Sequence, residues 1–225
     1  MNTPAAKAAL VIFAREPRDG RVKTRLLKTL SAKKVTPLYK AFLRDVLAVA
    51  SGVSCDAKFI FYAGPSSEIS FLKRFRKKFI LKPQRGPDLG ERMLNAVSSC
   101  RKNGFEKIVI IGTDCLTLNE KVIARAFDEL DHVDVVLGPC VDGGYYLIGL
   151  KKSYKMLFRH RDWGTPSVLA ETLNQAAEAG LRTVLLKKME DIDDYSSLKR
   201  FSQKNGYGLA AFYTKKILTK IFRHP

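Results

Sequence analysis

The chain has 225 residues, of which 46% are hydrophobic and 28% are charged. These fractions match those of ordinary globular proteins, so they exclude a disordered, collagen-like or disulfide-dense chain. Its 40 Lys and Arg residues outnumber its 22 Asp and Glu residues, and the resulting net charge of +18 attracts phosphates, nucleic acid and anionic lipid.

Several classes of protein are disfavoured by what the sequence lacks. No apolar run approaches the roughly 18 residues that a membrane-spanning helix needs. Residues 1–10 lack the apolar stretch of a secretory signal, so we expect a cytoplasmic protein. With three histidines and no GxSxG motif, a Ser-His-Asp hydrolase is disfavoured. Ordinary reduced thiols are favoured over a zinc knuckle by the wide spacing of Cys55, Cys100, Cys115 and Cys140.

Strand and helix patterns alternate along the first part of the chain. Residues 8–14 (AALVIFA) form an unbroken apolar run, typical of a strand that is covered on both faces. After a basic loop at residues 15–23, apolar residues recur at helical spacing behind Thr36-Pro37, which predicts a helix that begins there. This alternation predicts a mainly parallel sheet with ligands at the carboxyl ends of its strands. We expect further strands at residues 58–63, 79–82 and 107–112, and further helices at residues 66–76, 89–102 and about 119–130.

The alternation ends at residues 133–150, where two apolar segments flank Asp142-Gly143-Gly144 and predict an antiparallel strand pair. The chain shows no linker and no internal repeat. We therefore predict one α/β domain over residues 1–225, a three-layer sandwich with a core at about residues 8–198. After the strand pair we expect a helix near residues 165–179, a strand at 182–186, an acidic loop at 190–194 and a basic helical tail at about 208–225.

Four polar clusters follow the ends of predicted strands. The first, residues 15–26, carries up to five cations, and Gly20 allows its backbone to approach a phosphate. A solvated basic loop explains this composition equally well. The second places Asp114 directly after a buried strand, as a hard oxygen ligand for Mg²⁺ or Mn²⁺. Its rival role is to cap the helix that begins near Asn119.

The other two clusters are acidic or glycine-rich. Turn chemistry alone explains Asp142-Gly143-Gly144-Tyr145-Tyr146. In the fourth cluster, residues 190–194, four carboxylates repel one another unless solvent or a cation neutralises them. Helix capping accounts for one of these carboxylates and leaves the others available as ligands.

Six segments, taken together and in this order, resemble one known family. The likeness extends from about residue 8 to residue 198. The family is the uncharacterised, DUF2064-like group of GT-A-like nucleotide-diphosphosugar transferases, which is distantly similar to the guanylyltransferases that act on molybdenum cofactor and on 2-phospholactate. The segments are ARxPxxGxVKTRL at residues 14–26, QRGPDLGERM at 84–93, GTDC at 112–115, GPCVDGGYYLIGL at 138–150, WGTPSV at 163–168 and DID at 191–193.

This resemblance implies a GT-A (Rossmann-like) fold and a set of roles. Asp114 with Asp191 or Asp193 would hold the Mg²⁺ or Mn²⁺ ion. Asp142 would be the catalytic base, with Lys23 and Arg25 stabilising phosphate charge. The implied acceptor side holds Gly143, Gly144, Tyr145 and Trp163. The implied nucleotide and phosphate contacts are Ala14, Arg15, Gly20, Lys23, Arg25, Gln84, Leu89 and Arg92. Two departures affect loop geometry, since Leu116 stands where the family has proline and Asp194-Tyr195 replaces Thr-Pro.

Two reactions fit these residues. Glycosyl transfer from a nucleotide-diphosphosugar to a small-molecule acceptor would release a nucleoside diphosphate, and we favour it because the sugar transferases are the more similar group. Nucleotidyl transfer would instead expel pyrophosphate from a nucleoside triphosphate. Both reactions need nearly the same groups to stabilise phosphate charge.

A non-catalytic protein that binds polyanions is the third alternative. The tail at residues 212–223 pairs apolar with basic residues and would suit peripheral contact with an anionic inner membrane surface. We favour the simpler interpretation, in which its apolar side closes the core. The basic run at residues 73–78 lacks the spaced aromatics of a nucleic-acid reader, which disfavours that partner. Trp163, the single tryptophan, fits a core position better than a stacking platform.

Overall fold

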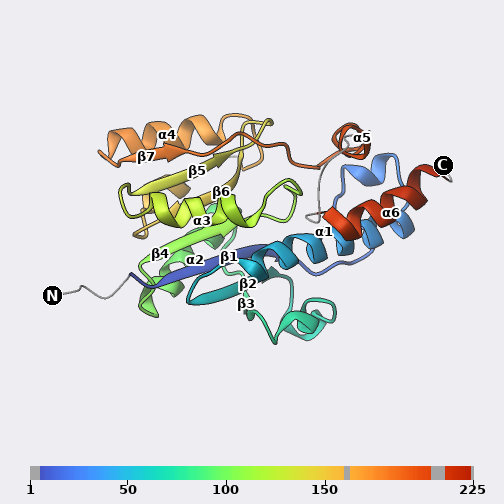
Figure 1. Ribbon diagram of the computed structural model, residues 1–225, viewed down its shortest axis with the longest axis horizontal. Coiled ribbons are helices and arrows are strands. Elements are labelled where there is room, and N and C mark those ends of the chain that lie inside the picture. The colour runs from blue at the N-terminus through green and yellow to red at the C-terminus, as the bar shows by residue number, and fades with distance from the viewer. Residues whose placement is uncertain (1–5, 160–162, 204–210, 224–225) are drawn as a thin grey trace.

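A seven-stranded sheet forms the centre of the computed structural model, which describes residues 6–159, 163–203 and 211–223. The strand order is β3-β2-β1-β4-β6-β5-β7 (Figure 1). β6 is antiparallel to its neighbours β4 and β5, and the remaining neighbours are parallel. This sheet confirms the predicted fold class. The strands are β1 (Ala8–Arg15), β2 (Ala57–Ala63), β3 (Ile80–Pro83), β4 (Lys107–Ile111), β5 (Val135–Pro139), β6 (Tyr145–Leu150) and β7 (Thr183–Leu185).

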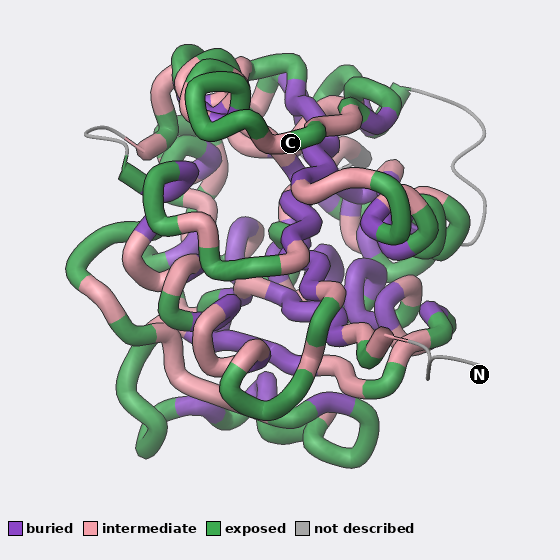
Figure 2. Tube along the Cα trace, turned by 90° about the vertical axis from the view of Figure 1, so that its left-hand side faces the viewer, coloured by how far each residue is buried: buried purple, intermediate pink, exposed green. Residues whose placement is uncertain are grey.

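Helices cover both faces of the sheet, and successive residues of β1 enter two different cores. Leu10 and Ile12 pack in a core with α1, α3, α5 and α6, whereas Ala9 and Val11 pack in a core with α2 and α4. The buried stretches follow the strands and the inner helix faces, and the exposed stretches lie outside them (Figure 2). The helices are α1 (Ala32–Gly52), α2 (Leu89–Lys102), α3 (Glu120–Glu129), α4 (Val168–Glu178), α5 (Tyr195–Gln203) and α6 (Phe212–Arg223).

The strand directions bring the carboxyl ends of β1, β4, β5 and β7 to one edge of the sheet. β5 is parallel to β4 because the antiparallel β6 lies between them. The loops that carry Lys23, Asp114, Asp142 and Asp193 therefore leave the sheet at the same edge, as expected for a ligand site in an α/β fold.

The first helix begins earlier than predicted. α1 starts at Ala32, so Pro37 lies inside it and not at its first turn. Proline lacks an N–H, and at this position it forfeits one hydrogen bond to the preceding turn. The additional turn buries Val35, whose exposed fraction is 1%, and this apolar burial offsets the lost bond.

The predicted helix at residues 66–76 is also wrong. This segment forms two short 3-10 helices, η2 (Ser66–Glu68) and η3 (Leu72–Phe75). The carboxylate of Glu16 lies between them and accepts hydrogen bonds from the backbone N–H groups of Ser70, Phe71 and Leu72 at 3.0, 2.6 and 3.1 Å. Glu16 thus ties the first loop of the site to this segment and interrupts a continuous helix.

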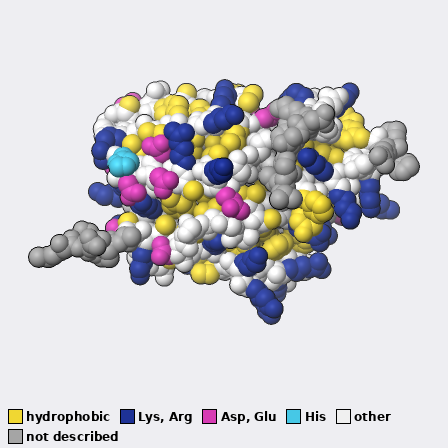
Figure 3. Space-filling view, viewed as in Figure 1, with side chains coloured by type: hydrophobic (Ala, Val, Ile, Leu, Met, Phe, Trp, Pro, Cys, Tyr) yellow, Lys and Arg dark blue, Asp and Glu magenta, His cyan; other side chains and the backbone are white. Residues whose placement is uncertain are grey.

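The basic tail forms α6, which packs against α1. Asp45 of α1 accepts the N–H groups of Tyr213 and Thr214 at 2.9 and 2.8 Å, and so caps the first turn of α6. Leu218 and Ile221 are buried in the core. The apolar side of the tail therefore faces the protein, and Lys and Arg side chains gather on the outside at this end (Figure 3). Residues 208–210 of the predicted tail lie outside the described residues.

Two further properties follow from burial and helix length. All four cysteines are free thiols. Burial raises the pKa of Cys100 to about 11 and the pKa of Cys115 to about 12, so these thiols stay protonated at neutral pH. Within residues 6–159, 163–203 and 211–223, every helix is too short or too polar to cross a bilayer.

We expect Glu16→Ala to lower the free energy of unfolding by about 2–4 kcal/mol, because it leaves buried N–H donors of the η3 segment without an acceptor. Urea unfolding followed by circular dichroism measures this loss. The matched control is Glu68→Ala, which removes an exposed ion pair with Arg18 and should change stability little. Equal effects of the two substitutions would show that Glu16 does not hold this segment.

Candidate functional site

A cleft of about 460 Å³ opens at the carboxyl edge of the sheet. It is lined by the loop after β1, by the start of α2 and by the end of β4. Gly20, predicted to contact phosphate, lies in the same loop with φ +73° but is not among the described residues that line the cleft. The predicted nucleotide contacts that do line it are Ala14, Arg15, Lys23, Arg25, Gln84, Leu89 and Arg92.

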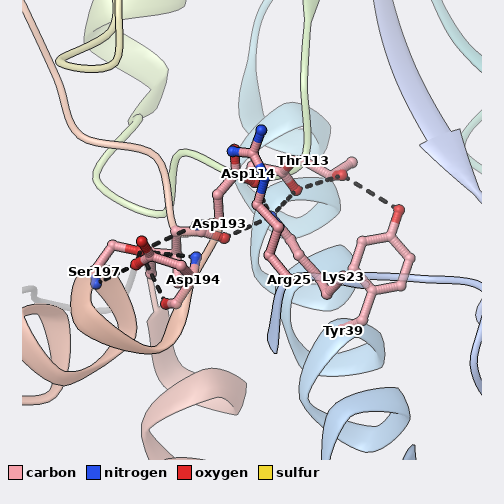
Figure 4. Close-up of polar contacts among 9 residues, drawn as sticks. Lys23, Arg25, Tyr39, Thr113, Asp114, Asp193, Asp194 and Ser197 are labelled. Atoms are coloured by element: carbon pink, nitrogen blue, oxygen red, sulfur yellow. Dashed lines mark hydrogen bonds and ion pairs between the residues drawn. The ribbon is translucent and has the colours of Figure 1, made fainter. Parts of the chain in front are cut away.

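The ammonium group of Lys23 joins three separate segments at the base of this cleft (Figure 4). Its Nζ lies 2.9 Å from Oδ1 of Asp114 and 2.9 Å from Oδ1 of Asp193, and it donates to the carbonyl oxygen of Ile192. These partners take up all three N–H groups of the ammonium. The predicted contact of Lys23 with phosphate would therefore require one of these bonds to break.

Burial and charge act in opposite directions on Lys23, whose side chain is only 5% exposed. Burial alone would lower the pKa of Lys23, but the charges of Asp114 and Asp193 and the hydrogen bonds to them together raise it above its usual value. The lysine is therefore charged at neutral pH. Its backbone has φ +47°, a left-handed conformation that a non-glycine residue rarely adopts, and the side-chain bonds help to hold it there.

A chain of hydrogen bonds that starts at Tyr39 of α1 supports Asp114, and sequence reasoning missed it. The hydroxyl of Tyr39 accepts the N–H of Arg15 at 3.1 Å and lies 3.3 Å from Oγ1 of Thr113, which in turn donates to Asp114. Burial, followed by the charge of Asp114, raises the pKa of Tyr39. Tyr39 is thus a neutral hydroxyl that connects the first loop to the end of β4.

The predicted metal ligands only partly converge. Asp114 and Asp193 approach one another, but the ammonium group of Lys23 lies where an ion bridging their Oδ1 atoms would lie. Among the described residues, no group of three or more Asp, Glu, His or Cys side chains is placed to hold a metal ion. The arrangement does not fit an ion shared by Asp114 and Asp193 while Lys23 stays in place, so metal dependence remains a prediction.

A second pocket, of about 250 Å³, adjoins the first. Phe13, Leu89, Gly112 and Asp193 line both. Of the residues predicted on the acceptor side, Gly144, Tyr145 and Trp163 line it, together with the predicted base Asp142 and with Asp191.

Gly143 has a packing role beside this pocket. It has φ +91°, and a Cβ on it would overlap the carbonyl of Pro166, so glycine is required there. Trp163 is half-buried and packs over Gly90 of α2, where a Cβ would meet its ring. The tryptophan therefore belongs both to the core and to the wall of the pocket.

The acidic loop divides its carboxylates between two tasks. Asp191 lines the second pocket, and its Oδ1 is buried without a hydrogen-bond partner. Burial, and then the charge of Asp114, raises the pKa of Asp191 to about 7. Asp194 instead accepts hydrogen bonds from the N–H and hydroxyl of Ser197, which lower its pKa and cap α5.

Two predicted nucleotide contacts also hold the backbone of the cleft. Gln84 donates to the carbonyl oxygens of Ala14 and Phe61, at 3.3 and 2.9 Å, and so joins the ends of β1 and β2. Arg92 donates from Nε to the carbonyl of Gly86 at 2.9 Å. These bonds hold the walls of the cleft in place, so both side chains have a structural role besides the predicted contact with a nucleotide.

Comparison with known proteins gives one family match. The sequence model of the DUF2064 family, described as an uncharacterized protein conserved in bacteria, matches residues 46–165. None of the curated proteins is significantly similar in sequence. A crystal structure from Desulfovibrio desulfuricans G20, provisionally named a nucleotide-diphospho-sugar transferase, is similar with 27% identity and a TM-score of 0.87, covering 97% of this chain and 96% of that one.

Two further solved structures are similar in fold alone. A cytidylyltransferase from Leptospira borgpetersenii serovar Hardjo-bovis has 14% identity and a TM-score of 0.56, over 98% of this chain and 96% of its own. The inositol-1-phosphate CTP transferase from T. maritima has 13% identity and a TM-score of 0.56, over 94% and 98%. The fold is therefore shared with proteins named for two different reactions.

We expect Lys23→Met to lower the free energy of unfolding by about 1–3 kcal/mol, because it leaves two carboxylates facing each other without a cation. The loss is smaller than for a fully buried pair because both carboxylates are about a third exposed. Added Mn²⁺ should raise the melting temperature of this variant and leave that of the unchanged protein nearly constant, since the ion can then take the position of the ammonium.

The matched control is Arg25→Met, which removes a 61% exposed cation 3.7 Å from Asp193. We expect it to change neither stability nor the response to Mn²⁺ appreciably. Stabilisation of the unchanged protein by Mn²⁺ alone, to the same extent as Lys23→Met, would contradict the view that the lysine occupies the ion position.

Proposed function

Because the chain belongs to the DUF2064 family, whose sequence model spans residues 46–165, and because its fold is shared with nucleotide-using proteins, we propose that it is a transferase that uses a nucleotide-activated donor. The names of the similar structures state nucleotide-diphospho-sugar, cytidylyl or CTP transfer. The observation that carries the proposal is the pair of adjoining pockets. The first is a strand-end cleft whose five cations, Arg15, Arg21, Lys23, Arg25 and Arg92, outnumber its three carboxylates, Asp88, Asp114 and Asp193.

The first cleft suits a nucleoside diphosphate. Arginine guanidinium groups pair with phosphate oxygens through two N–H groups, and a partly enclosed cleft strengthens these contacts relative to bulk water. Gly20 and Gly86 have φ +73° and +135°, and each directly precedes a residue that lines the cleft, Arg21 or Pro87. Phosphate charge at this position is also favoured by the net charge of +18.

We favour glycosyl transfer in this cleft. An acceptor oxygen in the second pocket would bond to C1 of the donor sugar, while the C1–O bond to phosphate breaks and the nucleoside diphosphate leaves with the electron pair. The acceptor proton would pass to a carboxylate, for which Asp142 is our candidate because it lines the second pocket. Arg15 and Arg21 would stabilise the charge that develops on the leaving phosphate.

Nucleotidyl transfer is the alternative that a specific observation supports, since similar folds are named as cytidylyl and CTP transferases. In that reaction an acceptor oxygen bonds to the α-phosphorus and pyrophosphate leaves. A divalent ion stays a prediction for either reaction, because it would have to bind without displacing Lys23 or after the lysine moves. Peripheral contact with an anionic membrane stays a further prediction, in which the exposed lysines of α6 would take part.

Incubation with nucleotide-diphosphosugars or with nucleoside triphosphates, with Mg²⁺, with Mn²⁺ or with EDTA, distinguishes these reactions. We expect release of a nucleoside diphosphate from a sugar donor. Pyrophosphate release from a triphosphate would favour the alternative. Neither product, with no nucleotide binding by calorimetry, would leave a non-catalytic polyanion-binding protein as the better interpretation.

We expect Asp142→Asn to lower turnover by about 10²- to 10⁴-fold while donor binding is unchanged, because the substitution removes a general base and keeps the size of the side chain. Steady-state rates and calorimetric titration with a nucleoside diphosphate measure the two quantities. Asp131→Asn is the control, since it removes an acid that is paired with Lys107 away from both pockets. Full activity of Asp142→Asn would exclude this residue as the base.

A further inference from the structure

The two adjoining pockets differ in net charge. Five cations and three carboxylates line the first, so its cations are in excess. Three carboxylates, of Asp142, Asp191 and Asp193, line the second, and no Lys or Arg does so among the residues that the structure describes. Asp193 lies between the pockets, and its neighbour Lys23 already takes up part of its charge. Asp142, together with the ionised fraction of Asp191 at neutral pH, leaves the second pocket with a net negative charge.

The walls of the second pocket increase the electrostatic effect of this negative charge on a ligand. They are largely apolar and aromatic, so they screen charges less than water does. Asp191 stands among them with Oδ1 buried and without a hydrogen-bond partner, which is costly unless a ligand or a proton compensates. The apolar wall residues include Phe13, Met93, Tyr145, Trp163 and Val168.

We infer that the second pocket receives an acceptor without a phosphate group, either uncharged or positively charged, in which a hydroxyl lies next to an apolar or aromatic portion. This inference rests on the proposed function and deepens it by naming the acceptor class. A phosphorylated acceptor would bring two negative charges beside Asp142 and Asp191 with no facing cation in the described part of the pocket.

The inference also bears on the chemistry. A phosphate oxygen attacks as an anion and has no proton to lose, so a phosphorylated acceptor needs no base. A neutral hydroxyl must give up its proton when its oxygen forms the new bond, and a carboxylate in the pocket receives it. The carboxylates of the second pocket, and the lack of a cation among its described lining residues, thus both favour an acceptor with a neutral hydroxyl. This favours glycosyl transfer to a hydroxyl over nucleotidyl transfer to a phosphate ester.

Trp163 makes the charge preference measurable without turnover. It is the single tryptophan of the chain and lines this pocket, so a ligand that enters it should alter the intrinsic fluorescence. We would titrate the unchanged protein with benzyl alcohol, benzylamine and benzyl phosphate, which share one ring and differ in charge. The same series, repeated with a saturating nucleoside diphosphate present, keeps anionic probes out of the first cleft.

We expect benzyl alcohol and benzylamine to bind at least about tenfold more tightly than benzyl phosphate. Asp191→Asn should reduce this difference in affinity about threefold, and the remote control Asp131→Asn should leave the difference unchanged. Equal or tighter binding of benzyl phosphate would overturn the inference, and so would a fluorescence response to none of the three probes.

The outcome is separable from that of the proposed function. Calorimetric titration with a nucleoside diphosphate tests the first cleft alone. Nucleotide binding together with a preference for benzyl phosphate would keep the proposed function and overturn the acceptor class. A preference for the uncharged probe without nucleotide binding would support the pocket and overturn the donor. With sugar donors, products formed only on phosphorylated acceptors would also overturn the inference.

Discussion

The bonds of one buried ammonium group hold the carboxyl edge of this sheet together. Lys23 follows β1, Asp114 follows β4, and Asp193 precedes α5, so a single side chain joins segments up to 170 residues apart. Burial of a lone lysine is costly, and two facing carboxylates repel one another, so the ammonium and the carboxylates offset each other's penalties. The same contacts keep Lys23 in a left-handed backbone conformation and set the path of the cationic loop around the first cleft.

The direction of β6 explains why two pockets of opposite charge adjoin. If all strands were parallel, the chain would have to cross from the carboxyl edge of the sheet to the opposite edge after every strand. Because β6 returns antiparallel between β4 and β5, the turn at Asp142-Gly143-Gly144 lies at the same edge as the cationic loop. Gly143 packs against Pro166, and the N–H of Gly144 donates to Asp142, whose carboxylate lines the second pocket. The topology therefore places the turn that carries Asp142 beside the cationic loop within one site.

Local sequence patterns were sufficient for most of the fold. Apolar runs predicted the strands, α2 has the bounds that the sequence predicted, and the glycine turn predicted the antiparallel pair. The errors arose where distant residues decided the structure. Burial of Val35 extends α1 across Pro37, and the carboxylate of Glu16 replaces a predicted helix by two short ones. Both effects come from tertiary contacts, which cannot be read from a short stretch of neighbouring residues.

The sequence predicted the position of the candidate site at the sheet edge, but it did not predict the contacts within the site. The rule that ligands bind at strand ends placed Asp114 and Asp193 at one edge of the sheet, and the family resemblance supplied fewer than half of the residues that line the two pockets. Neither could show that Lys23 lies between the two acids, because its partners follow from the path of a loop. Tyr39 was missed for the same reason, since its hydroxyl reaches Thr113 across 74 residues of sequence.

The net charge and the charges within the pockets act over different distances. The excess of 18 positive charges creates a field that draws anionic donors toward the protein from a distance, and salt screens this field over roughly 10 Å. Inside the pockets, close contacts dominate, so a strongly basic protein can still contain an acidic pocket. Under the proposed function, the general attraction would bring phosphates to the edge of the sheet, and Asp142 and Asp191 would keep them in the first cleft. A donor and an acceptor of different charge could thus be directed to neighbouring pockets by the local charges, without a conformational change.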